Sequence, residues 1–305
     1  MKLEAKQNTN SITKHWDLML LLVPGLVLLG VFNYGPMIGT VLAFKDFHVD
    51  LGIMKSPWVG LDNFYQLFSS MDFLNAIRNT LLISVIHMFF EFTMPILLAL
   101  LLNEIRLHWF KRIIQTVTYL PYFFSWVILG GIFLLVLSRQ GPLNSFLIYF
   151  GFEPIQFFTN DVWFIITLVV TKIWKGIGYG AVIYLAALSG INPTLYEAAS
   201  IDGANRFQQI RNITLPSLVP TIVILFILSL GDILNAGFDQ VYNMYNPLVY
   251  DVSDIIDTYV LRHMEQMDYS IATAAGLFKS IVGLVLIVGV NKITNKMTNN
   301  EQGVW

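Results

Sequence analysis

The amino-acid sequence predicts an all-α membrane protein, a single domain with six transmembrane helices. Of its 305 residues, 55% are hydrophobic and only 12% are charged, and the mean hydropathy is +0.63. A soluble domain carries roughly 25% charged residues, so this chain has too few to cover a water-exposed surface. Its apolar residues also gather in windows of about 20 residues or more, the length that a helix needs to cross ~30 Å of hydrocarbon.

The six expected spans contain few charged residues. The first contains none, and its apolar run is longer than the core of a cleaved signal peptide, so we expect it to be retained. The later spans are interrupted only by Glu91, by Lys172 and Lys175, by Asp232 and by Lys279. Within one domain, 1–305, the expected spans are 18–44, 79–103, 113–138, 162–188, 218–238 and 271–290.

Lysine and arginine residues in the connections predict the orientation of the chain. If the N-terminus lies inside the cell, roughly twice as many of these residues fall on the cytoplasmic side as on the outer side. Both termini are therefore expected in the cytoplasm, and the acidic, aromatic loop 239–268 outside the cell. The predicted location is the cytoplasmic membrane, crossed several times.

Composition also excludes several functions. The net charge of −2 gives no basic field for nucleic acid. The chain has no cysteine, its five histidines are scattered, and it has no P-loop sequence for ATP. We therefore expect neither a metal nor another cofactor.

The connection 192–216 predicts two short helices with a sharp turn between them. Asn192 suits a helix N-cap, Pro193 a first helical residue, and Gly203 a left-handed helix end. Leu215 and Pro216 are expected to end the second helix. Such a pair of helices fits the cleft of a soluble partner, but an amphipathic connector resting on lipid headgroups would show the same pattern.

The same connection carries a motif. Glu197-Ala198-Ala199, Gly203 and Ile213-x-Leu215-Pro216 resemble, with the spacing intact, the signature of permease subunits of binding-protein-dependent ABC importers. The resemblance implies a type I permease fold and a transport subunit that is not itself an enzyme. It also implies that this loop inserts into the ATPase, with Glu197 paired to a basic group there and Gly203 at the turn. The implied coupling residues are Glu197, Ala198, Ala199, Asp202 and Gly203.

Further segments resemble the carbohydrate-uptake branch of these permeases. They are 174–179, 202–204, 238–242 and 246–247, and the last two are most similar to permeases for oligosaccharides and polysaccharide fragments. The resemblance implies alternating access driven by two separate ATPase subunits. It also implies a second, similar permease chain in a heterodimer, an extracellular sugar-binding protein, and an oligosaccharide or polysaccharide fragment as the substrate.

Polar residues inside the spans are candidates for the sugar site. Ser229, Asp232, Asn235 and Asp239 share one face of the expected fifth helix, where they line the path or mark its outer end. Glu91 lies one helical turn from His87. It is either a sugar contact or clasp facing the pore, or a protonated group bonded to a neighbouring helix.

The family resemblance adds two residues to this site and supports a third. In maltose-type permeases an aromatic residue and a glycine upstream of the motif, and a serine downstream of it, line the sugar site; they fall on Tyr179, Gly176 and Ser229. Two asparagines of those permeases are replaced here by Ile233 and Ala236. This difference implies another sugar, or contacts made mainly by the second permease. The substrate-binding candidates are Tyr179, Ser229, Asp232, Asn235, Gly176 and Glu91.

Two other classes of protein fit the composition. A polytopic membrane enzyme would need a catalytic pair facing one cavity, and no known catalytic spacing joins Glu91, His87 and Asp232. An ion-coupled secondary transporter would show an internal inverted repeat, and the sequence has no clear one.

Overall fold

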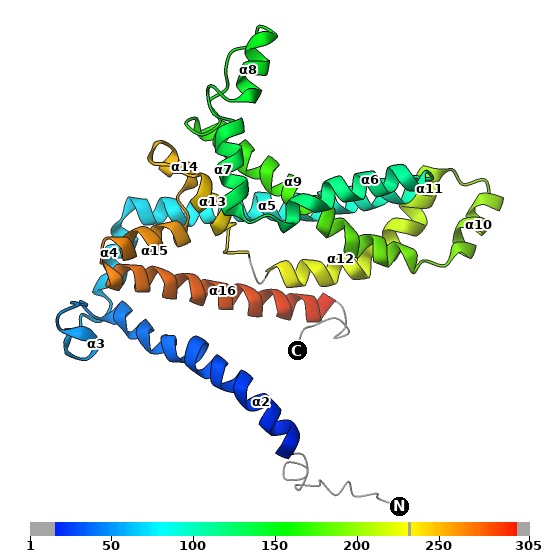
Figure 1. Cartoon of the computed structure of the whole chain (residues 1–305). Helices are drawn as coiled ribbons and strands as arrows, with labels where there is room; N and C mark the ends of the chain where they lie inside the picture. The colour runs from blue at the N-terminus through cyan, green and yellow to red at the C-terminus, as the bar shows by residue number, and fades with distance from the viewer. Residues whose placement is uncertain (1–15, 231–232, 298–305) are drawn as a thin grey trace, which may run out of the picture.

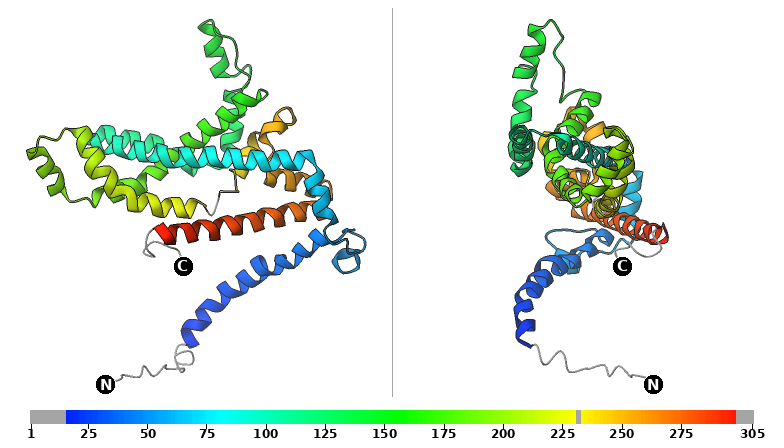
Figure 2. Two further views of the ribbon diagram at one scale, coloured as in Figure 1. Left: turned by 180° about the vertical axis from the view of Figure 1, so that it is seen from behind. Right: turned by 90° about the vertical axis from the view of Figure 1, so that its right-hand side faces the viewer.

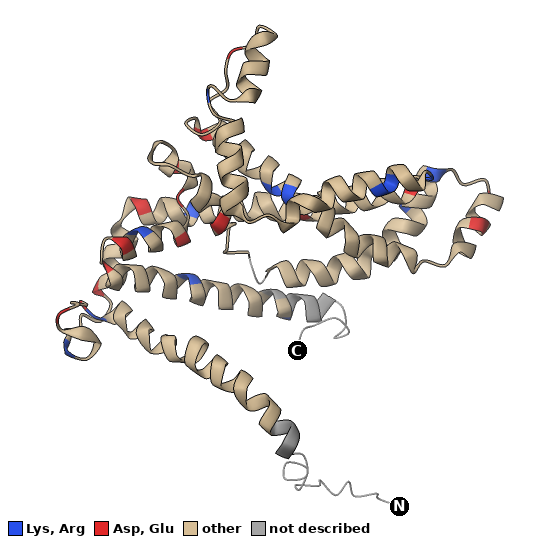
Figure 3. Cartoon of the chain, in the orientation of Figure 1, with Lys and Arg blue, Asp and Glu red and all other residues tan. Residues whose placement is uncertain are grey.

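The structure, a computed structural model, describes residues 16–230 and 233–297. Four long helices run side by side and form the body of the molecule (Figures 1 and 2). They are α5 (Met71–Glu104), α9 (Asp161–Ser189), α12 (Leu215–Leu230) and α16 (Tyr269–Met297). Five helices in the described residues are long and apolar enough to cross a membrane, or six if one bent pair is a single span. This confirms the predicted all-α membrane fold. Charged residues are sparse along these helices (Figure 3).

Glycines on α9 allow its neighbours to approach closely. A Cβ atom built on Gly180 would lie 2.8 Å from Cγ of Pro95 in α5, and one built on Gly178 would overlap the backbone carbonyl of Thr118. Without a hydrophobic drive between helices in lipid, such small residues let van der Waals packing hold the pair. Gly176, one helical turn before Gly180, has no atom within 4 Å of a built Cβ among the described residues.

The first span leaves the bundle at an angle (Figures 1 and 2). It consists of α2 (Trp16–Leu29), a π-helical turn, η1 (Gly30–Tyr34), and a 3-10 helix, η2 (Gly35–Phe44). Pro36 lacks a backbone N–H, which accounts for the change of helix type at this point. The η2 part of this span packs against α16 and α4 (Asp62–Ser69), whereas residues 20–29 of α2 are exposed.

The third expected span is not one straight helix. Residues 113–138 fall on α6 (His108–Tyr119), the short η3 (Leu120–Phe123) and α7 (Trp126–Val136), and the axis bends by 107° between η3 and α7. Pro121 removes one backbone donor, and the hydroxyl of Ser125 accepts a bond from the N–H of Ile128, which starts a new helix. Beyond the bend, α7 turns away from the bundle axis and packs against residues 238–244, and α8 (Pro142–Tyr149) extends past it (Figure 1).

The fifth expected span differs at both ends. The helix continues through Pro216, against expectation, because a π-helical turn, η4 (Ile210–Thr214), shifts the bonding register just before the proline. It ends at Leu230, so a single helix through residue 238 is wrong. Ala236 (φ 47°) and Gly237 (φ 74°) then form a left-handed turn before α13 (Phe238–Met244).

Short helices close the end of the bundle where α5 begins: α4 (Asp62–Ser69), α14 (Tyr250–Ser253) and α15 (Ile256–Glu265) (Figure 1). Hydrogen bonds and an ion pair hold α14 and α15 in place. The buried carboxylate of Asp254 accepts from Arg262 at 2.6 Å and from Thr258 at 2.8 Å. The amide of Asn79 in α5 donates to the carbonyls of Asp251 and Asp254. The loop 239–268 is therefore an ordered cap over this end.

Candidate functional site

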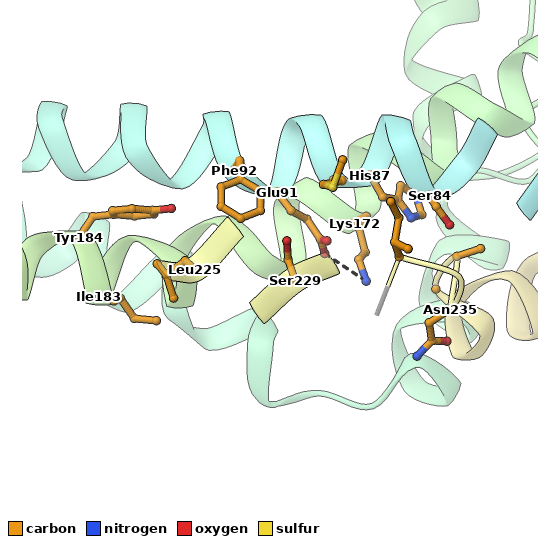
Figure 4. Close-up of a pocket in the computed structure, with 15 residues that line it drawn as sticks. Ser84, His87, Glu91, Phe92, Lys172, Ile183, Tyr184, Leu225, Ser229 and Asn235 are labelled. Carbon is orange, nitrogen blue, oxygen red and sulfur yellow. Dashed lines mark ion pairs between the residues drawn. The ribbon is translucent and has the colours of Figure 1, made fainter. Parts of the chain in front are cut away.

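A cavity of about 400 Å³ lies between α5, α9, α12 and the turn 235–237 (Figure 4). The helices around it are apolar, yet many of the side chains that line it are polar. Burying polar groups costs free energy unless they are bonded, so a polar cavity inside an apolar bundle indicates a binding site. The polar lining residues are Ser84, His87, Glu91, Lys172, Tyr184, Ser229 and Asn235.

An ion pair joins the two helices that form the cavity wall. Nζ of Lys172 in α9 lies 3.2 Å from Oε1 of Glu91 in α5 (Figure 4). The side chains keep 23% and 44% of their surface exposed, so both are open to the cavity. A second cavity, of about 200 Å³, shares Glu91, Lys172 and Gly180 with the first. The ion pair therefore stands between two chambers.

The second cavity has an aromatic side. The rings of Tyr122 in η3 and Tyr179 in α9 stack with centroids 3.9 Å apart and an interplanar angle of 7°. Nζ of Lys175 donates to the carbonyl of Tyr122 at 3.1 Å and also to that of Phe124. Lys175 thus satisfies carbonyls that the break in the third span leaves without helical partners. One helix, α9, places both the ion pair and this aromatic stack.

The connection 192–216 forms a compact projection at the opposite end from the short capping helices (Figure 1). Asn192 caps α10 (Pro193–Ile201) through the N–H of Thr194, and Gly203 adopts φ 78°, as the sequence predicts. Asn205 and Gln208 form a capping box on α11 (Arg206–Gln209). The buried amide of Gln209 donates to the Ser200 hydroxyl at 3.0 Å, which ties the two helices together.

This projection offers an unpaired surface. Glu197 and Asp202 are exposed, and the structure gives neither an ion-pair partner among the described residues. Two large apolar side chains, Ile201 and Phe207, are 87% and 71% exposed. Acidic and apolar groups held on a rigid turn suit a protein partner with a basic, apolar cleft.

A family comparison decides the class of this protein. The family described as the binding-protein-dependent transport system inner membrane component matches residues 91–298, which include the Glu91–Lys172 ion pair and the projection. The chain belongs to this family.

The permease is similar to proteins of known type over nearly its whole length. It is 45% identical over 290 residues to protein LplB of Bacillus subtilis (strain 168), covering 94% of this chain and 91% of that protein. It is 41% identical over 290 residues to the polygalacturonan/rhamnogalacturonan transport system permease protein YteP of the same organism, covering 94% and 90%. Among solved structures, a chain of a bacterial ABC transporter that imports the acidic polysaccharide alginate has a TM-score of 0.87. It shares 40% identity, with 95% and 98% of the two chains covered.

These findings confirm the predicted class. The permease is a multi-pass inner-membrane component of a sugar ABC importer and a transport subunit, and ATP hydrolysis belongs to a separate subunit of such systems. Its partners are those of the family: a second permease, ATPase subunits and a periplasmic binding protein. Both rival classes, a membrane enzyme and an ion-coupled transporter, are thereby set aside.

The structure separates the expected substrate-binding residues into two groups. Glu91, Ser229 and Asn235 line the larger cavity, and Glu91, Gly176 and Tyr179 line the smaller one. Asp232 lies outside the described residues. The expectation that Ser229, Asn235 and Asp239 share one helical face is wrong, because α12 ends at Leu230 and Asp239 lies in α13.

Some lining residues were missed from the sequence. Lys172, which the sequence shows only as a charge inside the expected fourth span, forms the ion pair with Glu91. Its spacing from Gly176 and Gly180, one helical turn at each step, places all three on one face of α9 and would have identified it. Tyr122 and Ser84 gave no such signal, because their positions depend on the break in the third span and on the packing of α12.

Proposed function

We propose that the permease forms the path by which an oligosaccharide fragment of an acidic polysaccharide crosses the cytoplasmic membrane, by alternating access driven by ATP. The observation that carries this proposal is the polar cavity with the Glu91–Lys172 ion pair inside the apolar bundle. The similarity to a permease of an alginate importer and to a polygalacturonan/rhamnogalacturonan permease supports an acidic substrate.

The chemistry of the cavity suits such a substrate. A sugar carboxylate is equivalent to the carboxylate of Glu91, and it can replace that group beside the ammonium of Lys172. Sugar hydroxyls both donate and accept hydrogen bonds, as the groups of Ser229 and Asn235 do. The ring of Tyr179 is 45% exposed and leaves a surface on which a sugar ring can stack, beside its contact with Tyr122.

The projection 192–216 is the proposed coupling element. We assign Glu197, Ala198, Ala199, Asp202 and Gly203 to contact with the ATPase. α12 continues directly from this projection toward Ser229, so a movement of the ATPase would be carried along one helix to the cavity.

The proposed orientation places both termini and this projection in the cytoplasm. Supporting it, the connection between α5 and α6 and the connection 190–214 lie at the same end of the bundle (Figure 1). Arg106, Lys111, Arg112, Arg206 and Arg211 lie in or beside these two connections. A single cysteine introduced at Asn205 should react with an impermeant thiol reagent only in opened membranes. Labelling in intact cells would overturn this orientation.

Substrate stimulation of the purified complex tests the proposed function. The complex in lipid vesicles, with its cognate binding protein saturated by each sugar in turn, should show the highest ATPase activity with uronate oligosaccharides. Glu91→Gln should retain uronate transport, and Lys172→Met should lose it. Equal activity with neutral and acidic sugars in all three proteins would exclude the acidic class.

Coupling is tested separately. Glu197→Ala removes the exposed charge, and Gly203→Val places a β-branched residue at φ 78°, where only glycine fits without strain. Both variants should lose transport while the spans remain folded. Normal rates of uptake in both would disprove the coupling role.

A further inference from the structure

Unpartnered polar atoms cluster at one place in the bundle. Among the described residues, six buried side-chain polar atoms lack a hydrogen-bond partner. Four of these atoms belong to three residues: the hydroxyl of Ser84, both ring nitrogens of His87 and Oε1 of Gln240. Native proteins bond nearly all such groups, so a cluster of them requires an explanation.

The cluster surrounds the left-handed turn 235–237. A Cβ built on Gly237 would lie 3.4 Å from Cε1 of His87 and 3.6 Å from Oε1 of Gln240. Ser84 and His87, which are 5% and 4% exposed, lie one turn apart on α5 and line the larger cavity together with this turn (Figure 4). The turn therefore lies against the imidazole of His87 and lines the same cavity as Ser84.

The same turn divides two cavities. Asn235 lines the cavity of about 400 Å³, and it also lines another of about 650 Å³ between α13, α15 and α16, with Asp257 and Lys279. The cavity of about 650 Å³ lies at the end of the bundle that is capped by the loop 239–268. A solute that passed from it to the inner cavity would have to pass the turn and meet His87 and Ser84.

We propose that His87 and Ser84 form a hydroxyl-binding subsite for the transported carbohydrate, covered by the turn 235–237 in this structure. The inference rests on the proposed function and adds residues to its site. A neutral imidazole offers one donor and one acceptor, and a serine hydroxyl offers both, which matches sugar hydroxyl groups. When the turn moves aside, substrate hydroxyls bond to the groups that the closed state leaves without partners.

The backbone of the turn is consistent with movement between two arrangements. Ala236 is held at φ 47°, a conformation that L-residues other than Asn and Asp rarely adopt. Its side chain is buried in a cluster with Ile83 and Val241. Local strain and unbonded polar groups both raise the free energy of the closed arrangement, and both are relieved if the turn opens onto a substrate.

Accessibility of an introduced thiol tests the subsite directly, since the chain has no cysteine. In the complete complex in vesicles, with the other subunits made free of cysteine, the thiol of Ser84→Cys should react slowly with methyl methanethiosulfonate at rest. It should react faster when a non-hydrolysable ATP analogue and the binding protein are added, and slowly again when the binding protein delivers trigalacturonate. The matched control is Val85→Cys, which is the next residue of α5 and has an apolar, 53% exposed side chain. Its reactivity should not respond to the sugar.

Transport gives a second, independent measurement. His87→Phe and Ser84→Ala should each lower transport per assembled complex by about two- to tenfold, the size of one neutral hydrogen bond. His87→Gln, which keeps a donor and an acceptor, should restore most of it. A purely structural role predicts altered assembly and an unchanged rate in each complex that survives.

The outcomes separate this inference from the proposed function. If the parent complex transports no oligosaccharide, the proposed function is wrong and the subsite with it. If the parent transports trigalacturonate but the thiol at position 84 never reacts, or reacts without protection by the sugar, the subsite alone is wrong. Parent rates in both His87→Phe and Ser84→Ala would also overturn it.

Discussion

The third span bends sharply at Tyr122–Phe124, and the expected fifth span gives way to a left-handed turn after α12. These two breaks differ in how the polar groups beside them are satisfied. At the break between η3 and α7, Lys175 reaches across from α9 and donates to the carbonyls of Tyr122 and Phe124. At the break after α12, a left-handed turn lies over His87, whose ring nitrogens have no partner in the described residues. At the first break the freed carbonyl groups accept hydrogen bonds from a side chain of another helix. At the second, the backbone is strained and nearby polar groups have no hydrogen bond.

The difference shows how a membrane helix bundle can combine a fixed wall with a movable one. Broken helices are tolerated in a membrane where other groups satisfy the freed backbone, and Lys175 performs that role for the third span. No comparable donor holds the turn 235–237 among the described residues. We therefore expect the stability of the protein to depend strongly on the first break and weakly on the second.

The largest loss of stability is expected from Gly178→Ala. The added methyl group would overlap the carbonyl of Thr118 in α6, which is backbone and cannot rotate away. Overpacking against backbone should destabilise the protein by ~3 kcal/mol or more and should abolish assembly of the complex. Gly176→Ala is the matched control, because a Cβ there meets no described atom within 4 Å. Yield and thermal unfolding of the two purified variants give the measurement, and equal stability would contradict the close approach of α9 to α6 that leads into the first break.

A smaller loss of stability is expected from Lys175→Met. This change keeps a long side chain and removes the charged donor from two carbonyl groups, which should cost about 1.5–3 kcal/mol. The stacked rings of Tyr122 and Tyr179 should become more mobile, because Lys175 no longer holds η3 against α9. Thermal unfolding and tyrosine fluorescence of the purified complex would show both changes. Lys175→Arg should keep most of the stability; a loss as large as that of Lys175→Met would mean that the donated bonds do not hold the break.

The smallest effect on the stability of the protein is expected at the second break. Whether a substitution there stabilises or destabilises should depend on which residue is changed. Gly237→Ala places a methyl group at φ 74° and should cost ~1 kcal/mol, whereas Ala236→Gly should stabilise the closed turn or leave it unchanged within ~1 kcal/mol. Thermal unfolding of the two variants, compared with the parent, gives the sign. Destabilisation of similar size in both would show that side-chain packing, not backbone conformation, controls this turn.

The sequence predicts the spans well and the breaks poorly, for a physical reason. The length and apolar character of a span are local properties, so the positions of α5, α9 and α16 follow from composition alone. A break depends on what satisfies it from elsewhere in the fold. Pro95 lies within the unbroken α5, whereas Pro121 accompanies a bend of 107°, and nothing in their immediate sequence distinguishes them.

The same limit applies to the candidate site. Glu91 was identifiable as a lone acid in a span, but its partner Lys172 lies on another helix, and pairing between helices is a tertiary property. Asn235 was identified through a helical face that does not exist, and Ser229 through that face and through the family resemblance. Both line one cavity because the chain turns after α12. The projection was predicted in most details, since its caps and its left-handed glycine are encoded within a few residues.

The contact between the first and the last spans has a consequence for the order of events during synthesis. Ala43 of η2 lies in the same buried cluster as Ala274 and Ala275 of α16, and the N–H of Phe47 donates to the hydroxyl of Ser270 at 2.9 Å. These partners are more than 200 residues apart, so the segment made first must wait in the bilayer until nearly the whole chain has left the ribosome. Until then η2 lacks its packing partner in α16. A chain that lacks α16 therefore leaves the apolar face of η2 around Ala43 without its partner.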